Sequence, residues 1–249
     1  MSLPFEPLWV LALVVAVIWI AALLQSALGF GQALIAMPLV TLLTDVRTAS
    51  ALVAVAGFSA TLLILAGQRQ QVNLREAWRL IVGSAIGVPL GVLFLTRLPE
   101  PVIVGGLGLM LIVFALYNLA HLQLPHLHQQ SLAFGFGALA GMLGGAYNTS
   151  GPPLVVYGML RRWTPEQFPA TLQSVFLVNG VLVLLAHSQS GLWTVQVGLL
   201  YIAGLPLLPL AVGLGRRLNR ALPREQFVRA VHLLLLVLGS VLLHAALTA

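Results

Sequence analysis

The chain lacks cysteine and lysine, and it carries few charged residues of any kind. Only 7% of its 249 residues are charged, whereas a soluble domain carries about 25%, so this chain cannot cover a water-facing surface. Without cysteine there are no disulfides, no thiol catalysis and no iron–sulfur clusters. Most of the sequence is apolar instead, with 59% hydrophobic residues and a mean hydropathy of +1.01. The composition predicts an all-α integral membrane protein, and no cofactor is expected.

The charge that is present is basic, with 12 arginines against 6 acidic residues. A sequence pI near 11.1 would suit a nucleic-acid binder. These arginines, however, lie in short loops between apolar runs, where they orient a membrane protein. We therefore expect no nucleic-acid partner, and we expect membrane lipid around the chain, with the arginine cluster at 216–229 placed to touch anionic lipid. The first charge is Glu6, so the run at 8–24 is interpreted as a retained span rather than a signal peptide.

The apolar runs define the expected spans, because a helix needs about 20 apolar residues to cross the hydrocarbon core. Eight long runs are predicted, at about 8–27, 48–66, 76–96, 102–120, 131–146, 166–186, 193–214 and 226–246. Two shorter runs, at about 32–44 and 152–160, each follow a glycine-rich or polar break. At about 1.5 Å per residue these two cannot cross unaided, and whether they cross fully or are re-entrant is left open.

The two halves of the chain share an ordered set of prolines and arginines. Pro38 in "QALIAMPLVTLL" has a counterpart in Pro153 of "SGPPLVVYGML". The segment "GVPLGVLFLTRLPEP" aligns with "LLPLAVGLGRRLNRALPRE", matching two prolines and an arginine. In each half a broken or short helical hairpin precedes three long transmembrane helices. We therefore predict a duplication in which residues 1–122 form the first repeat, 123–130 a linker loop and 131–249 the second repeat, together one membrane domain.

Arginine placement predicts that the two repeats have inverted topology. A half built from one broken hairpin and three spans crosses the membrane an odd number of times, so the second half starts on the opposite side. If the 67–79 loop is cytoplasmic, ten of the 12 arginines lie inside and only Arg47 and Arg97 lie outside, in agreement with the positive-inside rule. We expect a multi-pass protein of the bacterial cytoplasmic (inner) membrane with both termini outside.

Polar residues and glycines interrupt the apolar sequence once in each half, in "ALGFGQALIAMP" and in "GGAYNTSGPPLVVYG". Irregular backbone is tolerated at membrane depth only where it is buried in protein or lines a cavity. Each break is expected to precede a short helix, and a helix start presents free N–H groups and about half a positive charge, which favour an anion. We predict a small-anion site between the two helix starts. Its expected substrate-binding residues are Gly29, Phe30, Gly31, Gln32, Asn148, Thr149, Ser150, Gly151 and Gln173.

Two further groups of polar residues need an interpretation. Gln25, Gln173, Ser174 and Asn179 are other polar residues in the middle of spans. Interhelical hydrogen bonding is the default expectation for such side chains, and only Gln173 is assigned to the transport pathway. The histidines of the central loop are His121, His126 and His128. Their spacing matches no compact metal motif, so a solvated linker and no metal site are expected.

The two broken segments resemble those of the TauE/SafE family, which comprises sulfite and organosulfonate exporters as well as uptake permeases for related sulfur anions. The family pattern is a glycine cluster followed by proline in the first half, and a glycine-rich stretch that ends in Gly-Gly-Pro in the second. The matching positions are Gly29, Gly31, Pro38, Gly144, Gly145, Gly151, Pro152 and Pro153. Gln32, Asn148 and Ser150 stand where the pattern has glycine, which adds side-chain donors at the expected site.

The resemblance implies a secondary transporter rather than an enzyme, with an exporter as the leading hypothesis. Its substrate would be a small sulfur-containing anion such as sulfite or a sulfonate. Export needs no further drive, because one negative charge gains about 2.3 kcal/mol per 100 mV by leaving an inside-negative cell. A proton- or sodium-coupled importer is the alternative. An intramembrane serine protease that uses Ser150 and an ion channel are the competing classes, and a homodimer is left open.

Overall fold

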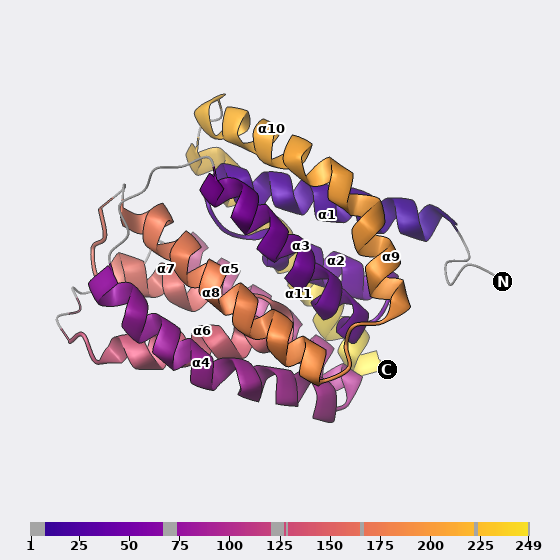
Figure 1. Cartoon of the computed structure of the whole chain (residues 1–249), viewed down its shortest axis with the longest axis horizontal. Coiled ribbons are helices and arrows are strands. Elements are labelled where there is room, and N and C mark those ends of the chain that lie inside the picture. The colour runs from indigo at the N-terminus through magenta and orange to yellow at the C-terminus, as the bar shows by residue number, and fades with distance from the viewer. Residues whose placement is uncertain are drawn as a thin grey trace.

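The computed structural model describes residues 8–66, 74–120, 127, 129–164, 167–221 and 224–248. Within these ranges every element is a helix and there is no strand, as the composition predicts. The central-loop histidines lie outside the described residues. The elements are α1 (Leu8–Leu28), α2 (Gln32–Leu43), α3 (Val46–Ala66), α4 (Leu74–Arg97), α5 (Glu100–Leu119), α6 (Leu132–Tyr147), α7 (Gly151–Leu160), α8 (Gln167–Gln189), α9 (Val195–Gly204), η1 (Leu205–Leu207), α10 (Leu208–Ala221) and α11 (Arg224–Thr248) (Figure 1).

Seven helical stretches of the described chain are long and apolar enough to cross a membrane. They are Trp9–Leu28, Val46–Ala66, Ala77–Arg97, Glu100–Leu119, Gln167–Gln189, Val195–Asn219 and Val228–Thr248. The protein is therefore a multi-pass helical membrane protein, and the predicted positions of these spans agree with the structure to within a few residues.

Two of the predicted long runs differ from the structure in detail. The run at 131–146 forms α6, which has only 16 residues and so spans about 24 Å at 1.5 Å per residue. This helix ends because Asn148 adopts a left-handed backbone conformation. The run at 193–214 is divided into α9 and α10 by the 3-10 turn η1, which contains Pro206. Proline lacks the N–H that a continuous α-helix requires, which explains the change in winding.

The helices are arranged in pairs on two sides of the molecule (Figure 1). Helix α4 packs along α6 on one side, and α1 packs along α10 on the other. Helices α3 and α8 contact each other and lie between these pairs, while α5 packs against α11. Each of the short helices α2 and α7 folds back on the helix before it, α1 and α6 respectively. The pairs α4–α6 and α10–α1 are equivalent under the predicted duplication, which stays a prediction, as does its inversion.

The α4–α6 contact is built on glycine, a feature that the apolar runs alone do not disclose. The seam contains one glycine every four residues on each helix, namely Gly83, Gly87, Gly91, Gly137, Gly141 and Gly145. A Cβ added at Gly87 would overlap the carbonyl oxygen of Ala138 on α6, so the two backbones touch directly. Small residues allow this close approach in membranes, where packing rather than apolar burial holds helices together. The seam fixes α6, and with it the start of α7.

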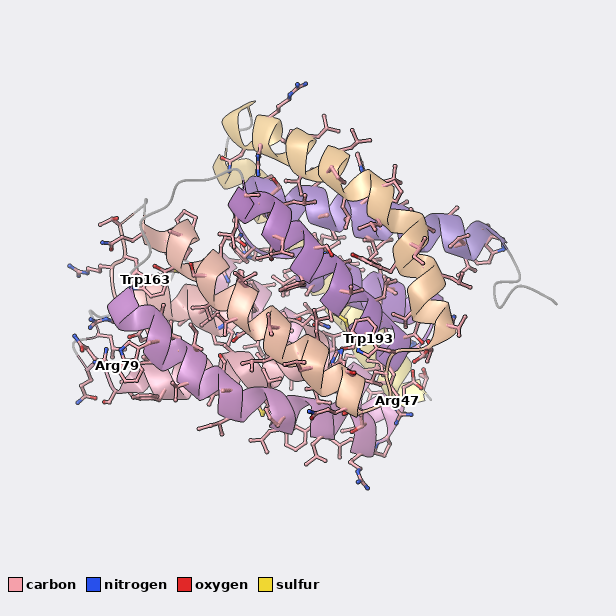
Figure 2. The ribbon with its side chains drawn as sticks, in the orientation of Figure 1. Arg47, Arg79, Trp163 and Trp193 are labelled. Atoms are coloured by element: carbon pink, nitrogen blue, oxygen red, sulfur yellow. The ribbon has the colours of Figure 1, made fainter. Side chains whose placement is uncertain are left out.

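Arginine and tryptophan side chains mark the two ends of the helices. In Figure 2, Arg79 and Trp163 lie at one end of the molecule, and Arg47 and Trp193 lie at the opposite end. Arg216 joins the first end, because its guanidinium donates to the carbonyl oxygens of the last turn of α3 at 2.7 and 3.1 Å. Tryptophans at both ends are typical of the two membrane interfaces. The start of α1 and the end of α11 both lie towards the Arg47 end (Figure 1).

Candidate functional site

The first helix break is made by two glycines in conformations that other residues avoid. Gly29 has φ +85° and Gly31 has φ +101°, and α2 begins directly afterwards at Gln32. Backbone at such positive φ is accessible to glycine without steric cost. No side chain caps the start of α2. The N–H groups of its first turn therefore lack an intrahelical acceptor, as at any helix start.

In the second break, side-chain hydrogen bonds fix the backbone turn, whereas the first break depends on glycines. Asn148 has φ 56° and ψ 18°, and its side-chain Nδ2 donates to the backbone oxygen of Ser50 on α3 at 2.6 Å. The Thr149 hydroxyl donates to the carbonyl oxygen of Tyr147 at 2.8 Å. Asparagine tolerates the left-handed region because its short polar side chain forms such local and tertiary bonds. The polar run is thus a structural turn as well as part of a cavity wall.

Prolines open the short helix α7, as the sequence predicts, but they change what this helix start can offer. Helix α7 begins at Gly151, with Pro152 and Pro153 as its next residues, and the preceding Ser150 forms no side-chain cap. Proline has no N–H, so two of the three first-turn donors expected at this end are missing. The backbone donors for an anion are therefore concentrated at the start of α2, and the start of α7 contributes mainly its dipole.

A small cavity of about 90 Å³ lies between the two helix starts. This volume is several times the roughly 10–15 Å³ that one water molecule needs. Its polar lining comprises Gln25, Gln32, Thr61, Asn148, Thr149, Ser150 and Asn179, and its walls include Phe30, Phe58 and Phe176. The residues from α3 and α8 that line it occupy the middle of those two long helices, at 53–61 and 176–183. The cavity therefore lies near the midplane of the membrane-spanning region.

Two carboxamides that line this cavity have no hydrogen-bond partner in the described structure. Gln32 is 4% exposed and Asn179 is 2% exposed, yet both polar atoms of each side chain are unpaired. Leaving a buried polar group unpaired costs about 1–3 kcal/mol, so such pairs persist where a ligand or water completes them. Gly57 leaves room beside Gln32, since a Cβ there would lie 3.6 Å from the Gln32 Oε1 atom. Two unpaired buried carboxamides beside a polar cavity make this region the candidate site.

The structure divides the nine predicted site residues between two adjoining cavities. Seven line the small cavity: Phe30, Gly31, Gln32, Asn148, Thr149, Ser150 and Gly151. Gly29 and Gln173 line a larger cavity of about 560 Å³, in which Gln173 Nε2 donates to the Gly29 oxygen at 2.8 Å. Phe30 and Gly31 line both cavities and so separate them. The larger cavity reaches Ile64 and other residues at the arginine-rich end of the helices.

The expected interhelical hydrogen bond is present for Gln25 and absent for Ser174 and Asn179 within the described structure. Gln25 Nε2 donates to the Thr61 hydroxyl on α3 at 3.0 Å, which is the expected interhelical bond. Ser174 donates within its own helix, to Ala170. Neither polar atom of the Asn179 side chain has a hydrogen-bond partner among the described residues, and the side chain lines the cavity. Sequence reasoning missed it because nothing in its immediate neighbours marks it, although its place at the middle of a long span was the available signal.

No group of three or more histidine, cysteine or acidic side chains that could hold a metal ion occurs among the described residues. The chemistry of the small cavity is instead that of neutral donors and acceptors: amides, hydroxyls and backbone N–H groups at a helix start. Such groups bind small anions, and the helix dipole favours negative charge at that position.

A helical membrane protein with broken helices that meet around a polar cavity at mid-depth has the architecture of a secondary transporter. The family model described as sulfite exporter TauE/SafE matches residues 14–242. The chain therefore belongs to the TauE/SafE family. It is also similar to a protein of Cupriavidus necator described as a probable sulfite/organosulfonate exporter TauE, with 29% identity over 204 residues that cover 78% of each chain. No solved structure shows a significant match.

Proposed function

We propose that this protein is a secondary transporter that exports a small sulfur-containing anion, such as sulfite or a small sulfonate, across the bacterial inner membrane. The observation that carries the proposal is the small cavity at mid-depth, where the unpaired carboxamides of Gln32 and Asn179 meet the start of α2. Family membership and the similarity to the probable sulfite/organosulfonate exporter of Cupriavidus necator support the choice of a sulfur anion.

The anion would bind through neutral groups. The first-turn N–H groups of α2 and the Gln32 amide supply donors, and the dipoles of α2 and α7 converge on the same cavity. The hydroxyl of Ser150 lies on the opposite break, packed against Gly144. Thr149 and Asn148 would shape the site rather than donate to the ligand. The Thr149 hydroxyl donates to the Tyr147 carbonyl oxygen, and the Asn148 amide donates to the backbone and hydroxyl oxygens of Ser50.

The larger cavity would be the route between the site and the cytoplasm. It lies towards the arginine-rich end of the helices, which the positive-inside rule assigns to the cytoplasm. In that orientation both termini are outside. Gly29 and Gln173 then belong to the route, and Phe30, which lines both cavities, must move for the anion to pass. The two repeats would rock against each other to open the opposite side.

The competing functions find less support in the geometry. A serine protease would need a general base beside Ser150, and no histidine lines the small cavity in the described part of the chain. A proton- or sodium-coupled importer stays as the alternative in the same class, and it differs in the direction of transport and in its response to ion gradients. An uncoupled exporter should run without either gradient.

Counterflow in proteoliposomes tests the proposal directly. Vesicles loaded with unlabelled sulfite should accumulate labelled sulfite transiently, and external sulfite or a small sulfonate should compete while chloride should not. An imposed sodium gradient should leave the exchange rate unchanged, and a proton gradient should change it only as far as the pH changes the charge state of sulfite. Failure of sulfite, sulfoacetate, thiosulfate and sulfate alike would refute the proposed substrate class.

A further inference from the structure

The small cavity contains no ionisable side chain among the described residues that line it. The titratable groups on neighbouring helices are engaged elsewhere. Tyr147 donates to the Ile103 oxygen at 3.0 Å, Tyr201 shares a 2.8 Å hydrogen bond with Ser59, and His187 Nε2 lies 3.2 Å from the Gly145 oxygen. His232 lines the larger cavity instead. The cation Arg216 on α10 donates to the carbonyl oxygens of Leu63 and Ile64 on α3 and does not line the cavity. An anion in the small cavity would therefore contact only neutral groups.

Dipoles stabilise one negative charge far better than two. The cost of removing an ion from water grows with the square of its charge, and it is large at membrane depth. The attraction to fixed dipoles and N–H groups grows only in proportion to the charge. A second negative charge thus adds more cost than attraction, unless a cation accompanies it.

The carboxamides reinforce this preference because each brings an acceptor as well as donors. Gln25 uses its Nε2 on the Thr61 hydroxyl, so its Oε1 is left as an unpaired acceptor beside the cavity. Gln32 and Asn179 can turn their NH₂ groups to an anion, but their oxygens remain close by. These partial negative charges penalise a dianion more than a monoanion.

We propose that the small cavity selects singly charged oxyanions and excludes dianions, so that the transported form of sulfite is hydrogen sulfite. The inference rests on the proposed transport function and adds a charge rule to it. Asn179 on α8 is part of this selective site. Its side chain is 2% exposed and lines the cavity, and its amide has no hydrogen-bond partner among the described residues. The limited volume of about 90 Å³ adds a size limit.

The second ionisation of sulfurous acid lies near neutral pH, so the two charge states can be varied at constant total sulfite. We expect the initial counterflow rate at low sulfite to fall about tenfold for each pH unit above that ionisation, because the hydrogen sulfite fraction falls in that way. Methanesulfonate, which is singly charged throughout this range, should compete equally well at every pH. Sulfate, which is doubly charged, should compete at least tenfold less well than methanesulfonate.

The outcomes separate the inference from the function. A rate that rises with pH, or sulfate that competes as well as methanesulfonate, would overturn the charge rule while leaving sulfite transport intact. If competition by methanesulfonate also weakens as the pH rises, the titrating group lies in the protein. This result too would overturn the charge rule. Absence of sulfite counterflow at any pH would refute the proposed function itself.

A variant tests the part played by Asn179. Asn179→Leu keeps the same branched heavy-atom shape and removes the donors, so the half-saturating concentration of hydrogen sulfite should rise about tenfold, or roughly 1.4 kcal/mol. Ser174→Ala on the same helix removes a hydroxyl that bonds only to Ala170, and it should leave this concentration unchanged. An unchanged half-saturating concentration in folded Asn179→Leu protein would remove Asn179 from the site.

Discussion

The break before α2 and the break before α7 border the same cavity, but they are built from different residues. The first uses glycines at φ +85° and +101° and leaves the backbone donors of α2 uncapped. The second uses Asn148, which is tied to Ser50 on α3, and it is followed by two prolines that carry no N–H. We propose that the first break binds the anion and that the second break holds the shape of the cavity.

The strongest test of this division is Gly31→Val. A β-branched residue at φ +101° is a strong backbone outlier and costs on the order of 1–3 kcal/mol. We expect loss of sulfite counterflow and a lower melting temperature, because nothing lies within 4 Å of the added Cβ and the penalty is therefore conformational. Gly135→Val on α6 is the matched control, since Gly135 also has open space but an ordinary helical φ. Full activity in Gly31→Val would contradict the assigned role of the first break.

A somewhat smaller effect is expected for Gln32→Leu, which should lower transport without lowering stability. Counterflow should fall at least tenfold because an anion donor is lost. The melting temperature without ligand should stay equal or rise, because the variant removes a buried amide whose atoms are unpaired at a cost of about 1–3 kcal/mol. Destabilisation together with retained transport would show that Gln32 serves the fold and not the ligand.

At the second break, Asn148→Ala should reduce stability more than transport. Alanine loses the 2.6 Å bond to Ser50 and must occupy the left-handed region at about 1–2 kcal/mol. Asn148→Gly loses the same bond without the conformational cost, so its melting temperature should lie between those of Asn148→Ala and the parent protein. Equal melting temperatures for the two variants would refute the conformational explanation.

The smallest effect is expected for Thr149→Val. The Thr149 hydroxyl has one proton, which it donates to the Tyr147 carbonyl oxygen, so it has none left for an anion. We expect a change in counterflow of less than about twofold at equal expression, with the isosteric valine preserving the cavity wall. A tenfold loss would show that Thr149 contacts the ligand after all.

Much of this architecture was predictable from the sequence because membrane helices obey a simple length rule. The apolar runs located the spans, and the glycine-rich and polar breaks located the starts of α2 and α7. The seven of nine predicted site residues that line one cavity follow from the same reasoning, because polar residues at a helix break must be buried together or line a space. Their role in binding remains a proposal.

Other features depend on tertiary contacts that no local pattern encodes. Asn179 was expected to form an interhelical bond, and only the packing of α8 beside α3 shows that its amide stands alone at the cavity. The shortness of α6 depends on the bond from Asn148 to Ser50, 98 residues away in the chain. The start of α7 offers fewer backbone donors than the start of α2, and the sequence shows this directly in Pro152 and Pro153.

The most direct test of a mid-depth anion site is sulfite binding to purified protein, measured as a ligand-dependent rise in melting temperature. Binding stabilises the folded state by about 2.7 kcal/mol at a ligand concentration 100 times Kd. The parent protein and Ser174→Ala should show this rise, whereas the double variant Gln32→Leu/Asn179→Leu should be folded and show none. If the double variant is stabilised by sulfite as strongly as the parent, the anion does not bind in this cavity.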